Sequence, residues 1–274
     1  MNGRIAALWS TLIIAAMWSA VGAQAHAEKP LYAKHATAFD PECEFETGGI
    51  YPTVSHCQPI TVPSPNGERQ IQIVYGKPVN VDGDRARIAH LEIKTRIGTT
   101  QLLRLPEGFE PIDLQWSPDS RAFFLNGGNG GAYWGFWTWA YFLGSGGRFE
   151  KVNVMRVVAH NMDESFPPCK ASGIDSAVCN KAFKPEADHS SDYNISGIGW
   201  SSDPPGLVVM AEVPCSSSEG GIMCQVKGYV VSLPGGRILK QMSGQELKQQ
   251  WQGSMAFDLR IPPPPQYGPT AQKP

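Results

Sequence analysis

The chain has 274 residues, of which 42% are hydrophobic and 18% charged, and its formal net charge at pH 7 is −2. It has no run of Lys and Arg, so it lacks the electrostatic footprint that binds nucleic acid or an anionic membrane, and we expect neither as a partner. The length suits one all-β domain with a substantial core.

Residues 1–27 have the pattern of a secretory signal peptide. Arg4 is followed by an apolar run from Ile5 to Val21, and the small residues Ala23, Ala25 and Ala27 offer two cleavage sites. This apolar run is of marginal length for a membrane span. The alternative interpretation is an uncleaved membrane anchor. No later stretch is long and apolar enough to cross a membrane. We therefore expect a periplasmic or secreted protein without membrane insertion after cleavage.

All six cysteines follow this segment, and an even number in an exported chain favours disulfides over metal or catalytic thiols. Six cysteines allow about 15 connectivities. Their spacing favours the three local pairs Cys43 with Cys57, Cys169 with Cys179, and Cys215 with Cys224. The chain has no Cys-x-x-Cys and no paired His spacing, so we predict no metal site and no cofactor.

Residues 28–57 are polar and are predicted to form an N-terminal strap, whereas residues 58–261 carry the alternation of β-strands. We predict three units of four strands, with an insertion at 161–194 between the second and third units. The strands of the three units are predicted at 60–62, 70–73, 87–93 and 99–105, at 112–116, 122–125, 133–143 and 149–158, and at 198–200, 207–213, 225–233 and 237–241.

Each unit has a similar turn between its first two strands. The turns begin at Ser64, Ser117 and Ser201, and the first two combine Pro in the second position with Asn or Asp in the third, as type I turns do. The first two turns are 53 residues apart, close to the ~40 to 50 residues of a propeller blade. Trp116 and Trp200 precede the last two turns, and we expect them in equivalent buried positions.

The C-terminal part has a different pattern. Ser243-Gly244-Gln245-Glu246 is a capping box, which predicts a short helix that ends near Trp251. Residues 256–261 are predicted as a last strand that closes or covers an edge. The tail at 262–274 begins with four prolines, so it is predicted to be extended or disordered.

The segment Trp116-Ser117-Pro118-Asp119-Ser120, with Ile112 and Leu114 before it, resembles the repeat of TolB-type and WD40-like propellers. The resemblance implies an all-β, propeller-like stack of antiparallel four-stranded blades with about three recognisable repeats, in a bacterial envelope protein. Because propellers typically close with ~4 to 8 blades, three outcomes stay open. The strap and the last strand form a fourth sheet, the blades remain an open arc, or two copies associate as a homo-oligomer.

One strand has a functional alternative. Seven of the ten residues from Tyr133 to Phe142 are aromatic, and they follow a glycine-rich loop at 127–131. In one interpretation both faces of this strand are buried between two blades. In the other, the strand is a binding surface for a protein, peptide or glycan, formed by Tyr133, Trp134, Trp137, Trp139 and Tyr141.

Catalytic patterns are missing from the sequence. The segment 144–147, Gly-Ser-Gly-Gly, lies between two predicted strands and is a tight turn rather than a nucleophile elbow. The best polar cluster is Asp188, His189 and Asp192. We therefore expect an exported, non-catalytic binding or scaffold protein. The alternative is an envelope or secreted hydrolase or lyase, in which this cluster converges with Asp82 or Asp84 on loops of the blades.

Overall fold

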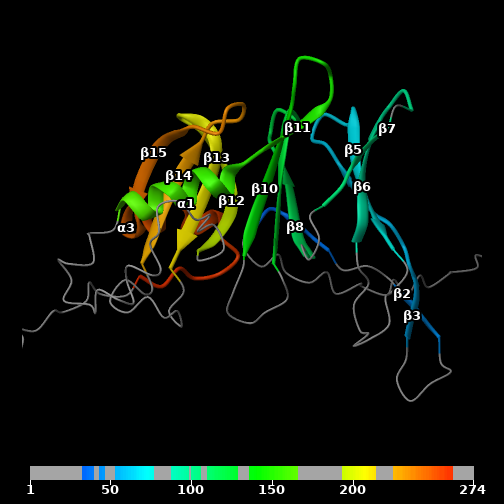
Figure 1. The fold of residues 1–274 in the computed structure, drawn as a ribbon, viewed down its shortest axis with the longest axis horizontal. Coiled ribbons are helices and arrows are strands. Elements are labelled where there is room, and N and C mark those ends of the chain that lie inside the picture. The colour runs from blue at the N-terminus through cyan, green and yellow to red at the C-terminus, as the bar shows by residue number, and fades with distance from the viewer. Residues whose placement is uncertain are drawn as a thin grey trace, which may run out of the picture.

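The computed structural model describes residues 33–39, 43–46, 53–76, 88–98, 100–105, 110–128, 136–165, 193–213 and 225–261. These residues form three antiparallel β-sheets that stand side by side, a separate two-stranded hairpin and a few short helices (Figure 1). The predicted all-β class is confirmed. The described residues form neither a closed barrel nor a closed propeller.

In each sheet, four strands that follow one another in the chain are also neighbours in space. The first sheet consists of β4 (Ile60–Pro63), β5 (Arg69–Tyr75), β6 (Ile88–Thr95) and β7 (Thr100–Leu103). The second consists of β8 (Glu110–Trp116), β9 (Ala122–Gly128), β10 (Trp137–Leu143) and β11 (Phe149–Val152), with β1 (Thr37–Ala38) added beside β8. The third consists of β12 (Asn194–Ser202), β13 (Pro205–Glu212), β14 (Val226–Val231) and β15 (Ile238–Ser243).

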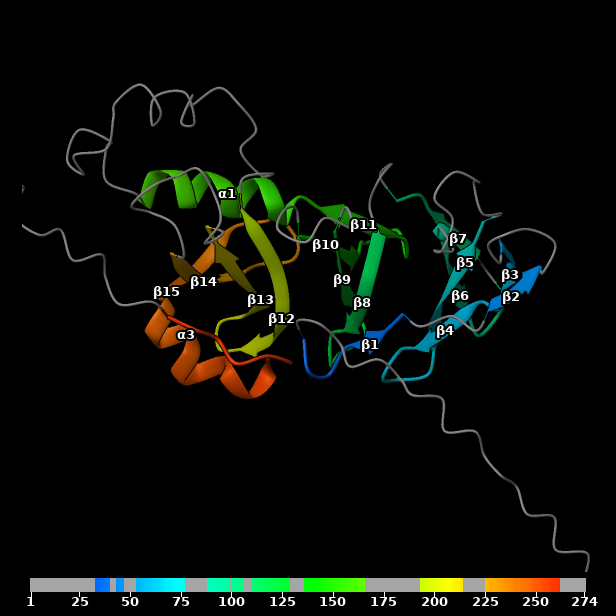
Figure 2. The ribbon, with the colours of Figure 1, turned by 90° about the horizontal axis from the view of Figure 1, so that it is seen from below.

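The second sheet lies between the other two (Figure 2). Apolar side chains fill both gaps. The gap to the first sheet buries Ile71, Leu91 and Phe123, and the gap to the third buries Phe124 and Val209. Successive residues of a strand point to opposite faces, which is why the neighbours Phe123 and Phe124 enter different cores. Burial on both faces explains why the strands of this sheet have long apolar runs.

The two ends of the stack are finished differently. The outer face of the third sheet is apolar and is covered by α3 (Gly244–Trp251), by the short helix η4 (Gln252–Ser254) and by residues 255–261. The outer face of the first sheet is polar, because Glu92 pairs there with Lys94 at 2.9 Å and with His90 at 3.3 Å. The hydrogen bond from Lys94 lowers the pKa of Glu92. Among the described residues, neither end therefore presents a large apolar face to water, although Leu102, opposite Glu92, is exposed.

The N-terminal strap joins the second sheet to the segment that follows α3. Thr37 pairs with Leu114 in β8, while Ala33 pairs with Met255 and the Lys34 N–H donates to the Ser254 carbonyl at 2.8 Å. The predicted last strand at 256–261 is wrong, because these residues are irregular and pack across the third sheet through side chains. Strap and C-terminal segment therefore share a single bridge instead of forming a fourth sheet in the described residues.

The fourth strand of the second unit is shorter than predicted, because α1 (Val154–Ser165) begins where we expected a strand through residue 158. The Asn153 side chain caps this helix by accepting from the Arg156 N–H at 3.2 Å. Val154, Val158 and Met162 recur every four residues and are fully buried. Helical spacing on one face therefore outweighs the β-branched character of the valines.

The predicted C-terminal helix is confirmed as α3. Ser243 is its N-cap: the Glu246 N–H donates to the Ser243 hydroxyl at 3.3 Å, and the Ser243 N–H donates to the Glu246 carboxylate at 2.7 Å. These two bonds satisfy groups that a helix start leaves unpaired, so the capping box fixes where the helix begins.

The strap also contains the antiparallel hairpin of β2 (Cys43–Glu46) and β3 (Thr53–Cys57). Cys43 lies directly opposite Cys57, and Cys57 is disulfide-bonded. The other two predicted pairs, Cys169 with Cys179 and Cys215 with Cys224, lie outside the described residues. All three pairings stay predictions.

The two tryptophans before the turns differ in burial, so their truncation should differ in cost. Trp116 is 6% exposed and packs on Phe123 at a ring distance of 5.2 Å, whereas Trp200 is half-buried. We expect Trp116→Ala to lower the free energy of unfolding by about 3–5 kcal/mol, and Trp200→Ala to lower it by less. Urea denaturation of both variants measures the difference. Equal losses would contradict the unequal burial.

Candidate functional site

The turns that begin at Ser64 and Ser117 are closed by the hydroxyl groups of these serines. Ser64 Oγ accepts from the Arg69 N–H at 3.0 Å, and Ser117 Oγ accepts from the Ala122 N–H at 2.8 Å. Ser232 holds the loop between β14 and β15 in the same way, through the Arg237 N–H at 3.1 Å. The sequence reading missed this last serine because Leu233 stands where Pro65 and Pro118 stand in the first two turns.

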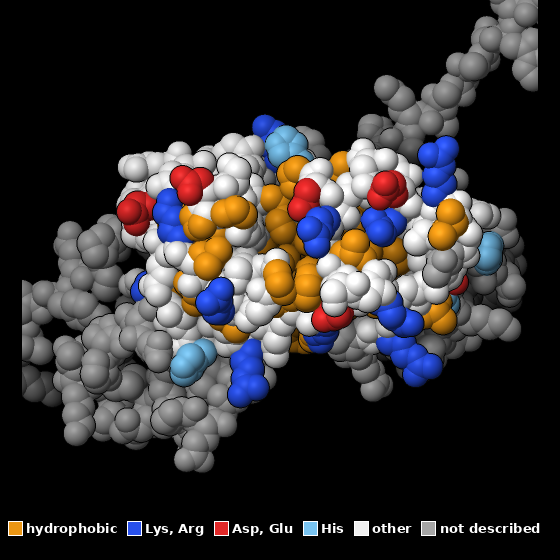
Figure 3. All heavy atoms as spheres, turned by 90° about the horizontal axis from the view of Figure 1, so that it is seen from above, with side chains coloured by type: hydrophobic (Ala, Val, Ile, Leu, Met, Phe, Trp, Pro, Cys, Tyr) orange, Lys and Arg blue, Asp and Glu red, His pale blue; other side chains and the backbone are white. Residues whose placement is uncertain are grey.

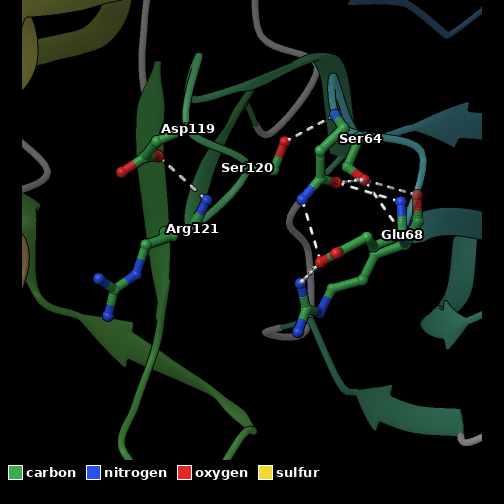
Figure 4. A network of polar contacts seen from close by, with 7 residues as sticks. Ser64, Glu68, Asp119, Ser120 and Arg121 are labelled. Atoms are coloured by element: carbon green, nitrogen blue, oxygen red, sulfur yellow. Dashed lines mark hydrogen bonds and ion pairs between the residues drawn. The ribbon is translucent and has the colours of Figure 1, made fainter.

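The first two turns lie side by side and are bonded to each other (Figure 4). The Asn66 N–H donates to Ser120 Oγ at 3.0 Å, and the Trp116 indole N–H donates to the Val62 carbonyl at 3.2 Å. Farther along, the Gln101 amide exchanges two bonds of 2.8 Å with the backbone of Phe149. These contacts fix the distance between the first and second sheets.

Ser120 adopts a backbone conformation that non-glycine residues avoid. Its φ is 60°, and Gly67, at the equivalent place in the first turn, has a φ of 68°. The serine carries the cost of this left-handed conformation, and its hydroxyl supplies the acceptor for Asn66. The inter-sheet bond offsets the strain.

A cleft of about 550 Å³ opens beside these turns. Three segments line it: the strap, β4 with its turn, and β8 with its turn. Its lining residues are His35, Thr37, Val62, Pro63, Ser64, Pro65, Leu114, Gln115, Trp116 and Pro118. Among the described residues of the lining, His35 is the one ionisable side chain, so the cleft suits an uncharged ligand surface.

The Ser64 hydroxyl group in this cleft is already engaged. Ser64 Oγ lies 2.9 Å from both Asn66 Oδ1 and the Arg69 carbonyl, and it accepts from the Arg69 N–H. A serine nucleophile must be free to pass its proton to a base. Ser64 is therefore a turn residue rather than a partner for His35 in catalysis.

The structure describes three of the five aromatic residues that were predicted to bind a partner. Tyr133 and Trp134 lie outside the described residues, Trp137 and Trp139 are half-buried, and Tyr141 is 3% exposed. Trp137, Trp139 and Tyr141 pack toward the first sheet, which is the environment expected of a core strand. A binding role for the two tryptophans stays a prediction.

Burial shifts the pKa values of two side chains in the second sheet. The Tyr141 ring stacks on Phe123 with ring centres 5.0 Å apart, and desolvation raises the pKa of Tyr141 to about 12. Lys151 Nζ lies over the Trp139 ring, a cation–π contact, and burial lowers the pKa of Lys151. The half-buried Trp139 therefore has one face covered by a side chain of its own sheet.

A buried polar network joins the second and third sheets, and the sequence reading did not find it. Asn126 Nδ2 donates to Asp113 Oδ1 at 2.8 Å, the Gly197 N–H donates to Asn126 Oδ1 at 2.8 Å, and Thr138 Oγ1 donates to the Ile195 carbonyl at 3.1 Å. Asp113, Asn126 and Thr138 are at most 1% exposed. Because their groups are bonded to the protein, the network serves the packing of the sheets.

The polar cluster of Asp188, His189 and Asp192, and its expected partners Asp82 and Asp84, all lie outside the described residues. Among the described residues, no group of three or more His, Cys, Asp or Glu side chains is arranged to hold a metal ion. In the same part of the chain, no helix is long and apolar enough to span a membrane.

Known proteins give little guidance. No family model matches the chain, and no curated protein matches it. A solved structure of a functionally unknown protein from Desulfotomaculum acetoxidans DSM 771 aligns with 76% of this chain at 10% identity and a TM-score of 0.29. The aligned part is 52% of that protein, so the chain spans about half its length.

The strained turn residue offers a test with a matched pair. Ser120→Ala removes the acceptor for the Asn66 N–H but keeps the strain, so we expect the free energy of unfolding to fall by about 1–2 kcal/mol. Ser120→Gly also removes the acceptor but relieves the strain, and we expect a change below about 0.5 kcal/mol. Urea denaturation of both variants measures these two changes in the free energy of unfolding. A glycine variant at least as destabilised as the alanine variant would show that the conformation is unstrained.

Tyr141 predicts a loss of stability in alkali. Its pKa is raised from 10 to about 12, so the folded state holds the proton more tightly than the unfolded state. The resulting stabilisation is complete below pH 10 and is lost as the pH rises from 10 to 12. We expect Tyr141→Phe to flatten the stability profile in that window, measured by urea denaturation at fixed pH. An unchanged slope in the variant would assign the effect to other groups.

Proposed function

We propose that this protein is an exported, non-catalytic binding protein with propeller-like blades, and that it engages a partner protein or peptide through the cleft between the strap, β4 and β8. The observation that carries the proposal is the composition of the cleft. It combines apolar walls with several uncharged polar groups and one ionisable side chain, His35. Such a lining favours contact over acid–base chemistry.

The distribution of side chains on one face of the molecule supports a protein partner over a charged polymer. Figure 3 shows hydrophobic side chains gathered in the middle of one face, with acidic and basic side chains interspersed around them. A nucleic acid or an anionic membrane would call for charges of one sign. Mixed charges around an apolar centre are typical of protein interfaces.

A glycan is a weaker candidate for the cleft. Sugars stack on exposed aromatic faces, but Trp116 is 6% exposed and its indole N–H is bonded to Val62. Trp116 therefore forms the edge of the cleft and offers no stacking platform. Among the three partner classes considered, a protein or peptide fits the cleft best.

Export to the periplasm or the cell exterior is part of the proposal. It rests on the signal-peptide pattern of residues 1–27, on the even cysteine count and on the resemblance to TolB-type repeats. The second candidate, a hydrolase or lyase, rests on the polar cluster of Asp188, His189 and Asp192 alone.

The test compares two exposed threonines. Thr37 lines the cleft, whereas Thr100 lies in β7 outside it. We expect Thr37→Trp to fill the cleft and abolish cross-linked complexes with envelope proteins, and Thr100→Trp to leave them intact. Cross-linking in envelope extract followed by mass spectrometry reads out both variants, with thermal melts as the control for folding. Complexes that survive Thr37→Trp would move the binding site elsewhere.

A further inference from the structure

The strap pairs with only part of the free edge of β8. The register runs from Ala38 opposite Asp113 to Thr37 opposite Leu114, and the next contact upstream is a turn in which the Ala36 N–H donates to the Ala33 carbonyl at 3.0 Å. The strap then leaves β8, since the Lys34 N–H donates to Ser254. Beyond Leu114, β8 has no partner strand on this side among the described residues.

The direction of the backbone groups on this edge follows from the pairing. The Phe39 N–H donates to the Ile112 carbonyl at 2.9 Å, so Ile112 faces the strap. Alternate residues of a strand direct their N–H and C=O to the same edge, which places the backbone groups of Leu114 and Trp116 on the strap side as well. The opposite edge is occupied, because the Ser117 N–H donates to the Ala122 carbonyl in the hairpin with β9.

The far wall of the cleft is unsuited to strand pairing. Pro63 and Pro65 have no N–H, and the Val62 carbonyl already accepts from the Trp116 indole. Prolines at this position blunt a strand edge. A segment that enters the cleft therefore finds its backbone partners on β8 and side-chain contacts on β4.

We propose that the cleft takes an uncharged, extended polypeptide segment, which adds to the β8 edge at Trp116 beyond the point where the strap turns away. This inference rests on the proposed function and names its ligand class. The segment runs antiparallel to β8, and one of its residues exchanges two backbone hydrogen bonds with Trp116, as the residues of a hydrogen-bonded antiparallel pair do. Its neighbouring side chains lie against Val62 and Pro65. Charged side chains are disfavoured, because the described residues of the lining include no Asp, Glu, Lys or Arg to pair with them.

The test begins with a phage-displayed library of random octapeptides, selected on the wild-type protein and depleted on Thr37→Trp. We expect selected peptides whose central residues are uncharged. A scan with single N-methyl groups then removes the backbone donors one at a time. We expect about a tenfold loss of affinity when the methyl group replaces the donor to Trp116, and little change at the two adjacent residues, whose N–H groups point away.

Hydrogen exchange supplies a direct readout. The selected peptide should slow exchange of the Trp116 amide, while the Leu125 amide inside the second sheet should be unaffected. A second cleft variant, Thr37→Glu, guards against a folding defect in Thr37→Trp. It should weaken binding of the uncharged peptide and keep the wild-type melting temperature.

The outcomes separate this inference from the proposed function. If envelope complexes depend on the cleft but peptide binding tolerates N-methylation at every position, strand addition is wrong and the binding function stands. Selected peptides rich in Lys, Arg, Asp or Glu would also overturn the ligand class. If neither envelope complexes nor peptides distinguish Thr37→Trp from wild type, both proposals fall.

Discussion

Burial of the second sheet on both faces is the constraint on which the rest of the described structure depends. All seven residues of β9 are buried, and its neighbouring residues supply two separate cores. A sheet covered on one side only would leave one of these apolar rows in water. The first and third sheets are therefore needed as covers, and the polar bonds between sheets then fix the distances that packing leaves adjustable.

Polar bonds fix the two interfaces of this sheet at different positions along its strands. Toward the first sheet, the bonds join the two turns through Ser120 and the ends of strands through Trp116 and Gln101. Toward the third sheet, they lie within the strands, through Asn126 and Thr138. The glycine at 197 permits the second contact, because a Cβ there would approach the Phe124 ring to 2.8 Å. Trp116 and Trp200 therefore have different surroundings, and the turns that follow them also differ. The Ala122 N–H donates to Ser117 Oγ in the first, whereas Ser202 pairs with Pro205 in the second.

Local signals in the sequence were sufficient for the elements whose structure is determined locally. The hydrogen bonds of the Ser-Pro turns and of the Ser243 capping box join residues at most five positions apart. Both features are found as predicted. The helix α1 was missed because valines favour strands locally, while the buried face of Val154 and Val158 forms only against the sheets. The network at Asp113 had no local signal either, since its partners are up to 71 residues apart.

The cleft was beyond sequence reasoning for a related reason. Its walls come from three segments, and it exists because the strap leaves β8 after two paired residues to reach Ser254. The turns on either side are bonded to each other, and Trp116 is bonded to Val62, so the edge at Trp116 is held in place by contacts made for the packing of the sheets. The binding site proposed for this cleft needs no catalytic motif in the sequence, because its specificity would come from shape and from backbone groups. The absence of a recognisable motif is therefore compatible with a defined binding function.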